Sequence, residues 1–485
     1  YQAAMVRIGF ALTWLLFLLR EFPHRHELYG PDGPWSWEMG RRLIDDNGAF
    51  TALIWTDSQV WFEIVYALAM VSSVLLLLGW HTRAMSVLYM FGVLSLENRS
   101  IFMSDGGDNV IHLMAIYLVL TRCGAVWSLD ARRARRGAVA RARGEHLRTD
   151  VAGPLLWGVL GLALAVVSAM GHLGSGWLLI FWGLWMVHGL WWVVDRRASE
   201  GVVPGGAISR DGAPGSGAAP EDRDELSHGD PSRMGHSGEA LPGDAFRHAS
   251  TDASKDASKD ASKNASTDAS TDASKDVSRS EPRLLLNIIA NLAHNAGLLV
   301  IMAEACLIYA TAGWYKIQGS RWQDGTAVFY PLHLDYFSPW PALSRMLGEH
   351  GLVVLIITYG TVIMQVAFPF TLFNRRVKNV LLVAMICEHI VIAITLGLPF
   401  FSLAMIAADS VFLPTAFLVW LGALVARARG ALLPGTRRTT PGGHDERTDG
   451  SHEDAPPEHA LAQPAPQTPA VPETQAPVGT ADSRA

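Results

Sequence analysis

The chain has 485 residues, of which 50% are hydrophobic and only 17% are charged, and its formal net charge is −6. The charged residues gather in a few stretches and leave windows of about 20 apolar residues, enough to cross a bilayer core. This composition excludes an ordinary soluble protein, gives no support for nucleic-acid binding, and predicts an all-α, polytopic membrane protein whose first partner is the lipid bilayer. The three cysteines, Cys123, Cys306 and Cys387, lie too far apart for a metal or redox motif.

The apolar windows predict about ten transmembrane helices in two blocks, residues 1–194 and 284–428. The predicted spans of the first block are Ala3–Arg20, Val60–Gly79, Ala84–Leu96, Asn109–Trp127, Gly153–Gly171 and Gly176–Val194. Those of the second block are Leu284–Gly313, Gly351–Phe373, Asn379–Gly397 and Phe400–Val425. The span that starts at Ala84 is the shortest, and an interfacial position is an alternative for it.

Two polar segments complete the domain organisation. Residues 195–283 are rich in Gly, Pro and Ser and contain repeats of Asp-Ala-Ser-Lys or Asp-Ala-Ser-Thr from Asp252 to Lys275. Residues 429–485 are rich in Pro, Ala, Thr and acidic side chains. Neither segment can bury enough apolar surface to offset the entropy of ordering, so we predict a disordered linker and a disordered tail without catalytic residues.

Basic loops predict the orientation of the helices. Positive side chains crowd residues 132–148, 375–378 and 427–429, and ten spans place all three stretches on one side, which the positive-inside rule assigns to the cytoplasm. We therefore predict a multi-pass cell-membrane protein with its N-terminus, linker and C-terminus in the cytoplasm. Lys316 and residues 322–324 then lie at the outer face.

A lysine, two tryptophans and an aspartate follow a strongly apolar stretch within Ala312–Ala327. An ionisable cluster at a membrane boundary is either a functional site or an anchor. For Lys316 a catalytic base and a snorkelling anchor between tryptophans remain equal alternatives. Trp322 and Asp324 are candidate ligand-binding residues, but we favour a turn that Asp324 forms with Gly325.

Polar residues also occur near the middle of predicted spans: Glu304, Gln365, His389 and Asp409. A charge at the bilayer centre costs about 2.5–3.5 kcal/mol on insertion scales, so each side chain is expected to face protein or water. They could line one shared ligand cavity. The alternative, which we favour, is that they join helices by hydrogen bonds, with the two carboxyl groups protonated or paired with Arg7.

Asp108, Asn109 and His112 form a further candidate group. The spacing of four between Asp108 and His112 places both on one helical face. Two ligands without a third are a weak metal signal, so we predict no metal site and favour Asp108 or Asn109 as a helix cap.

Three separated blocks in this chain resemble the bacterial horizontally transferred transmembrane (HTTM) proteins, the prokaryotic relatives of vitamin K-dependent gamma-glutamyl carboxylase. The resemblance covers both membrane blocks and excludes the linker and tail. The blocks are Tyr309-Ala-Thr-Ala-Gly-Trp-Tyr-Lys316 with Trp322-Gln-Asp-Gly-Thr-Ala327, Gly106-Gly-Asp-Asn-Val-Ile-His112 with Trp127-Ser-Leu-Asp130, and His389 with Gly397-Leu-Pro-Phe-Phe-Ser402 and Asp409.

The resemblance implies a reduced quinone as cofactor and Lys316 as the base that starts its oxygenation. A lysine acts as a base only as the neutral amine, which burial near an apolar ligand favours. The carboxylase also uses an Asn-His pair, and the matching region here is Asp108, Asn109 and His112, with the histidine displaced by about a turn. The large exported domain of the carboxylase, which helps to hold the protein substrate, is replaced here by the tail.

Three functions follow from these observations. The first is a membrane enzyme that acts with a quinone or other apolar ligand at the outer face, with Lys316 as base. The second is a non-catalytic module that binds lipid or an exported peptide, or serves export or immunity. The third is a proton-coupled transporter that uses Glu304, His389 and Asp409.

Overall fold

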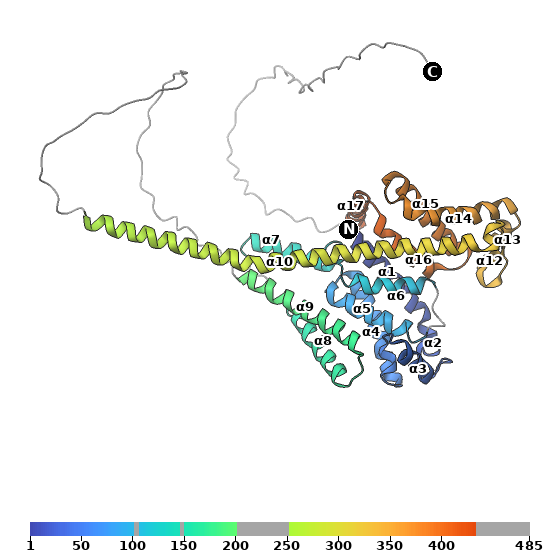
Figure 1. Ribbon diagram of the computed structural model, residues 1–485, viewed down its shortest axis with the longest axis horizontal. Helices are drawn as coiled ribbons and strands as arrows, with labels where there is room; N and C mark the ends of the chain where they lie inside the picture. The colour runs from blue at the N-terminus through green and yellow to red at the C-terminus, as the bar shows by residue number, and fades with distance from the viewer. Residues whose placement is uncertain (101–105, 146–149, 201–251, 433–485) are drawn as a thin grey trace, which may run out of the picture. The chain divides into compact units, whose positions relative to one another are not determined.

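The computed structural model of the chain is all-helical over the residues that it describes (Figure 1). Those residues are 1–100, 106–145, 150–200 and 252–432. Most of the predicted linker, residues 201–251, and most of the predicted tail, residues 433–485, lie outside them.

Helices α1 to α9 come from the first membrane block. They are α1 (Gln2–Glu21), α2 (Arg25–Tyr29), α3 (Trp37–Asn47), α4 (Gln59–Leu78), α5 (Thr82–Glu97), α6 (Gly106–Leu118), α7 (Leu129–Ala142), α8 (Ala152–Ala169) and α9 (Ser175–Glu200). The later helices are α10 (Asp252–Gln318), α11 (Ser320–Gln323), α12 (Phe329–Leu332), α13 (Pro341–Gly348), α14 (Gly351–Thr371), α15 (Arg375–Thr395), α16 (Pro399–Asp409) and α17 (Thr415–Leu432). A short 3-10 turn, η5 (Ser410–Phe412), separates the last two.

The polytopic helical membrane fold that the composition predicts is confirmed. Among the described residues, seven helices are long and apolar enough to cross a membrane, or eight if α16 and α17, bent by 116°, form one broken span. The ten predicted spans also included α5 and α6, which have only 16 and 13 residues. At 1.5 Å per residue these helices are about 24 and 20 Å long, shorter than a hydrocarbon core of about 30 Å.

Helices α5 and α6 are apolar because they are buried in protein. Together with α1, α4 and α16 they form the main core. The Tyr66 hydroxyl donates to the Leu18 carbonyl at 2.6 Å, and Tyr89 donates to the Phe10 carbonyl at 3.1 Å, so both buried phenols are satisfied. Because α5 and α6 follow one another in the chain, leaving both out of the set of membrane spans does not change the side of the membrane predicted for the ends of any later helix.

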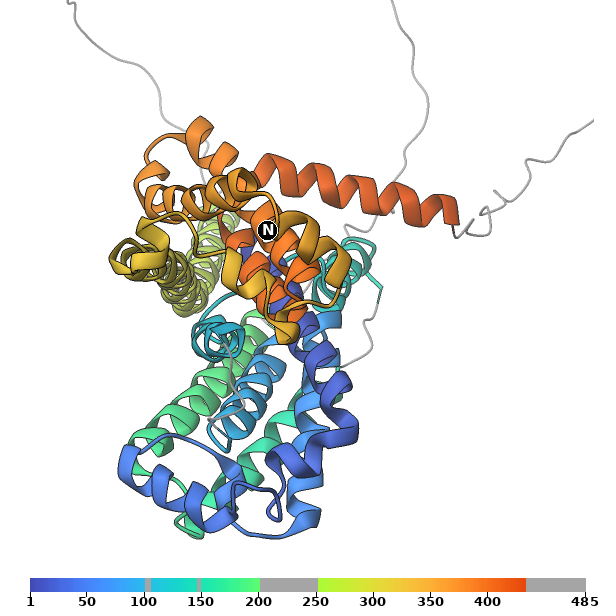
Figure 2. The same ribbon diagram turned by 90° about the vertical axis from the view of Figure 1, so that its right-hand side faces the viewer.

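Small residues bring α16 into the centre of this core. A Cβ at Gly9 of α1 would lie only 2.6 Å from the Cβ of Ala407, so the two helices touch where both side chains are smallest. Asp409, at the end of α16, is consequently fully buried. In Figure 2 the orange ribbon of the part of the chain that includes α16 overlaps the dark blue ribbon of α1, which α16 contacts.

Helices α10 and α15 contact α16, and α14 packs against both of them. The Tyr309 ring of α10 makes an edge contact with Phe368 of α14, with centroids 5.6 Å apart, and Phe368 makes another with Phe412 at 5.1 Å. A Cβ at Gly313 would lie 2.6 Å from a methyl of Val366, so α10 and α14 are in close contact. These contacts bring the polar side chains of α10, α14 and α15 close to one another.

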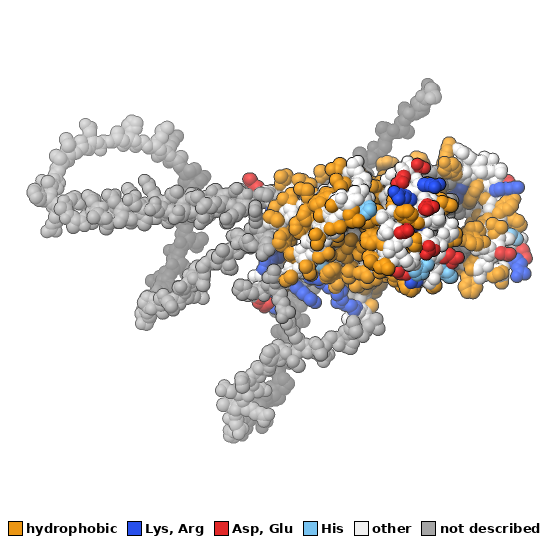
Figure 3. All heavy atoms as spheres, turned by 90° about the horizontal axis from the view of Figure 1, so that it is seen from below, with side chains coloured by type: hydrophobic (Ala, Val, Ile, Leu, Met, Phe, Trp, Pro, Cys, Tyr) orange, Lys and Arg blue, Asp and Glu red, His pale blue; other side chains and the backbone are white. Residues whose placement is uncertain are grey.

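The first part of α10 contains the four-residue repeats. The structure assigns a helical backbone to residues 252–282, which belong to the segment predicted from composition to be a disordered linker. From Arg283 to Gln318 the same helix is a candidate membrane span. Hydrophobic side chains cover broad areas of the face seen in Figure 3, as expected for helices that contact lipid.

Candidate functional site

Lysine, glutamine and glutamate side chains from three helices form a chain of hydrogen bonds. Lys316 Nζ of α10 donates to Gln365 Oε1 of α14 at 2.9 Å, and Gln365 Nε2 donates to Glu388 Oε1 of α15 at 3.1 Å. The amide orientation follows from its neighbours, since the ammonium or amine donates and the carboxylate accepts. Gln365 is buried, while Lys316 and Glu388 are half-buried.

A second chain of contacts joins Tyr309, His389 and Asp409. The Tyr309 hydroxyl lies 2.9 Å from both carboxyl oxygens of Asp409 and 3.2 Å from Nε2 of His389. Relative exposure is 0% for Asp409 and 2% for His389. If the hydroxyl donates its one proton to the carboxylate, it accepts a hydrogen bond from His389 Nε2. His389 Nδ1 is buried and has no hydrogen-bond partner among the described residues.

The two chains of contacts are neighbours because they share two helices. Tyr309 and Lys316 are seven residues apart on α10 and therefore lie on the same face, two turns apart. Glu388 and His389 are consecutive on α15 and point about 100° apart, so one contacts α14 while the other contacts α10. We call Tyr309, Lys316, Gln365, Glu388, His389 and Asp409 the polar network.

The position of Lys316 combines features of a site and of an anchor. It occupies the last turn of α10, where a cation interacts favourably with the helix dipole. Its Nζ also lies 5.3 Å from the centroid of the Trp322 ring, a cation–π distance. Trp322 therefore contacts Lys316, while its role in binding a ligand stays a prediction.

Asp324 has a local structural role. Its Oδ1 accepts hydrogen bonds from the Thr326 backbone at 3.0 Å and from the Thr326 hydroxyl at 2.5 Å, and Gly325 has a φ of +77°. These bonds from Thr326 hold the pKa of the exposed Asp324 carboxyl below its ordinary value. The predicted Asp-Gly turn is present, and its aspartate contacts no member of the polar network.

Glu304 and Arg7 lie outside the network. Glu304 is half-buried on α10 and makes no hydrogen bond or ion pair with another described residue. Arg7 is fully buried and donates from Nη2 to the Trp127 carbonyl at 2.7 Å. The anticipated pairing of Arg7 with Glu304 or Asp409 is thus absent from the ion pairs of the described chain.

Asp108, Asn109 and His112 form a separate group on α6. Asp108 is buried and Asn109 exposed in the first two turns, and His112 Nδ1 lies 3.7 Å from a carboxyl oxygen of Glu97. The Phe401 ring lies against the start of α6 and also stacks edge-on with His389 at 5.6 Å. The structure therefore brings these three residues near α16 without joining them to Lys316. Within the described ranges no three potential ligands are grouped around a metal position.

The Trp-Ser-Leu-Asp motif at residues 127–130 joins helix ends. The Asp130 carboxyl accepts from the backbone of His81 and Thr82 at 2.9 and 2.8 Å and from the Thr82 hydroxyl at 3.0 Å. Ser128 Oγ accepts from the backbone of Ala131 at 2.9 Å, which caps α7. The polar groups of this motif are engaged in capping α5 and α7.

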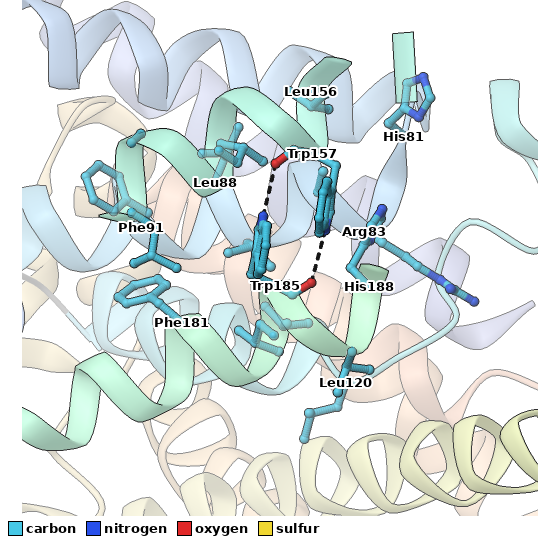
Figure 4. A pocket seen from close by; sticks show the side chains of 18 of the residues that line it. His81, Arg83, Leu88, Phe91, Leu120, Leu156, Trp157, Phe181, Trp185 and His188 are labelled. Atoms are coloured by element: carbon cyan, nitrogen blue, oxygen red, sulfur yellow. Dashed lines mark hydrogen bonds between the residues drawn. The ribbon is translucent and has the colours of Figure 1, made fainter. Parts of the chain in front are cut away.

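A cavity of about 420 Å³ lies away from the polar network. It is enclosed mainly by α5, α8 and α9, and none of the six network residues lines it (Figure 4). Trp157 of α8 and Trp185 of α9 stack in it with centroids 4.1 Å apart, and each indole donates to the backbone carbonyl of the other tryptophan.

Sequence reasoning selected Lys316, His389 and Asp409 but missed their partners Tyr309 and Glu388 as site residues. The seven-residue spacing between Tyr309 and Lys316 was the available signal for one partner. Glu388 could not be placed, because its angular offset from His389 does not reveal which helix it faces. No family model, curated protein or solved structure matches the chain.

Proposed function

We propose that the chain is an HTTM-type, carboxylase-like membrane enzyme in which Lys316 acts as a base on a reduced quinone or a similar apolar ligand with an acidic hydroxyl. The observation that carries the proposal is that Gln365 stands between Lys316 and Glu388. A lysine in direct contact with a carboxylate is held as the ammonium ion. An amide oxygen, by contrast, accepts a hydrogen bond from the neutral amine as well as from the ammonium ion.

The proposed step is a single proton transfer. The phenolic O–H bond of the ligand breaks, a new N–H bond forms at Lys316, and the products are a phenolate and an ammonium ion. Glu388, one amide away, stabilises the positive charge as it forms. Gln365 holds the amine in position throughout.

The surroundings of Lys316 suit a ligand that arrives from the bilayer. Trp314 and Tyr315 are exposed on the apolar surface beside it, with relative exposures of 60% and 73%. Trp322 contacts the amine from the side of α11. An aromatic ligand could therefore approach Lys316 between aromatic side chains without leaving the membrane.

The test is amine-reactive labelling of the full chain in reconstituted membranes, read out peptide by peptide at several pH values with and without a reduced naphthoquinone. We expect Lys316 to be labelled near neutral pH and protected by the quinone. Lys378 is the internal control, since it is a partly buried lysine in the first turn of α15 that donates to the Phe412 carbonyl of η5. Its labelling should not respond to the quinone.

Variants separate the base from the anchor. Lys316→Arg keeps the cation and the contact with Trp322 but cannot lose its proton, so quinone deprotonation should stop while the fold is retained. Gln365→Leu removes the amide that links Lys316 to Glu388, so the charge of Glu388 should then have less effect on the pH profile of Lys316 labelling. If Lys316 is labelled only at strongly alkaline pH and the quinone gives no protection, Lys316 is an anchor and a binding, export or immunity role becomes the better explanation.

A proton-coupled transporter is the second candidate, favoured by one observation. Tyr309, His389 and Asp409 form a buried series of proton-exchanging groups, and His389 Nδ1 carries an unused hydrogen-bonding position. Liposome uptake driven by a pH gradient and abolished by Asp409→Asn would support it. Uptake that is independent of the gradient would exclude it.

A further inference from the structure

The cavity of about 420 Å³ that Trp157 and Trp185 line, called the tryptophan cavity below, is mostly apolar. Its walls are leucine, valine, alanine and aromatic side chains from α5, α8 and α9, including Leu88, Leu160 and Phe181. At about 420 Å³ it falls within the range of roughly 300–1,000 Å³ found for ligand pockets. An elongated hydrocarbon therefore fits its chemistry better than a polar solute.

The tryptophan pair gives the cavity a fixed wall. A Cβ at Gly161 would lie 2.6 Å from the Trp185 ring, and one at Gly189 would lie 2.8 Å from the Trp157 ring. Each indole thus packs over a glycine of the other helix, four residues beyond the partner tryptophan. This reciprocal fit holds α8 and α9 together without filling the space toward α5.

One end of the cavity is basic. Its lining includes Arg83, Arg122, His81 and His188, and no aspartate or glutamate occurs among the described lining residues. Figure 4 shows His81, Arg83 and His188 toward the same end and Phe91 and Phe181 toward the other. The cavity therefore has an apolar body and one cationic end, which is the pattern expected for an anionic amphiphile.

Two arginines frame this end from different elements. The Arg83 guanidinium lies 4.3 Å from the Trp191 ring centroid and that of Arg122 lies 5.8 Å from it. Arg122 Nη1 donates to the side-chain amide of Asn291 at 2.5 Å. Both guanidinium groups therefore lie near the same indole ring, and arginine is the side chain best suited to bind phosphate through charge-assisted hydrogen bonds.

The cavity reaches the lipid-facing surface. Leu120 and Val187 line it, yet their relative exposures are 46% and 65%. We propose that the cavity binds one anionic glycerophospholipid, with an acyl chain along the tryptophan pair and the phosphate between Arg83 and Arg122. By the predicted orientation, the basic end lies in the cytoplasmic leaflet, where anionic lipids are found.

The experiment is native mass spectrometry of the full-length protein, purified in mild detergent and offered phosphatidylglycerol or phosphatidylcholine of equal chain length. We expect one phosphatidylglycerol to remain bound under conditions that remove phosphatidylcholine. The double variant Arg83→Gln/Arg122→Gln should lose at least tenfold in retention. Arg141→Gln is the matched control, because Arg141 is exposed on α7 and donates to its own helix at Gly137.

A second variant tests the apolar body independently of charge. Ala293→Trp adds a ring at the cavity wall and should abolish retention of phosphatidylglycerol while the two arginines remain. Far-UV circular dichroism and the unfolding midpoint check that each variant is folded. Equal retention of the two lipids, or retention of phosphatidylglycerol by folded forms of both variants, would overturn the proposal. Displacement of the lipid by inorganic phosphate alone would do so as well, because the acyl chain would then contribute nothing.

Discussion

Two sets of buried or half-buried charged side chains in this molecule are held in opposite ways. In the first membrane block, Arg7 and Asp130 bond chiefly to backbone groups at helix ends. In the second, Lys316, Glu388 and Asp409 bond to other side chains that can themselves donate or accept. A charge bound to the backbone fixes how helices meet, whereas a charge within a side-chain network can exchange a proton without moving a helix.

The largest effect should come from Gly79, where the first set is most crowded. Gly79 has a φ of +72°, and a Cβ there would lie 2.2 Å from Arg7 Nη1 and 2.8 Å from Ser128 Cα. Gly79→Ala should destabilise the protein by about 3 kcal/mol through backbone strain and overpacking. Gly48→Ala is the control, since Gly48 also has a positive φ but has open space around it, and should cost about 1 kcal/mol. Equal unfolding midpoints for the two variants in detergent would contradict the crowding.

Removing Asp130 should have the next largest effect. Asp130→Ala leaves two backbone amides and one hydroxyl at the start of α5 without their acceptor, a loss of about 2 kcal/mol. Asp150→Ala removes an aspartate that is 56% exposed and should change stability by less than about 0.5 kcal/mol. Thermal unfolding of the purified variants measures both. A Trp-Ser-Leu-Asp motif with a catalytic role would instead lose activity in Asp130→Asn without loss of stability.

Tyr309→Phe should have a smaller effect on stability and a larger one on chemistry. Loss of the hydroxyl removes its hydrogen bonds to His389 and Asp409 and should cost about 1 kcal/mol, as is usual for hydrogen bonds between membrane helices. Tyr66→Phe removes a buried hydroxyl that donates to a backbone carbonyl and should cost a similar amount. Only Tyr309→Phe should alter the pH profile of the candidate site, measured by Lys316 labelling. Identical profiles would show that the polar network is structural.

The smallest effect concerns the exposed turn beyond Lys316. Because the pKa of Asp324 is lowered in the folded chain, its contribution to stability is fully present above the ordinary pKa of aspartate and is lost as the pH falls through the folded value. The unfolding midpoints of the natural chain and of Asp324→Ala should therefore differ at pH 6 and converge in acid. A difference that grows on acidification would show that the sign is wrong.

The sequence predicted the class of fold and the polar stretches, because apolar windows and isolated charges are local signals. It did not predict that α5 and α6 are core helices, since a helix buried in protein and a short membrane span have the same composition. His389 and Asp409 could each be recognised as candidate site residues, because an ionisable side chain inside an apolar span is costly to bury. Their connection through Tyr309 depends on how α10, α15 and α16 meet, which no single stretch of sequence records.

The tryptophan cavity was missed for a different reason. Trp157 and Trp185 occur in unremarkable apolar windows, and the glycines that receive them, Gly189 and Gly161, lie on the opposite helix. The signal was a repeated spacing of four from tryptophan to glycine in two consecutive spans. It becomes interpretable only when the two helices are known to be antiparallel neighbours.

The consecutive placement of Glu388 and His389 on one rigid helix has a mechanical consequence. If α15 turned about its own axis by a few degrees, both side chains would move in the same rotational sense, one relative to Gln365 and the other relative to Tyr309. A molecule that displaced Gln365 from Glu388 would thereby shift His389 as well. Such a rotation of α15 would change the contacts at both ends of the polar network, the end at Lys316 and the end at Asp409, at the same time.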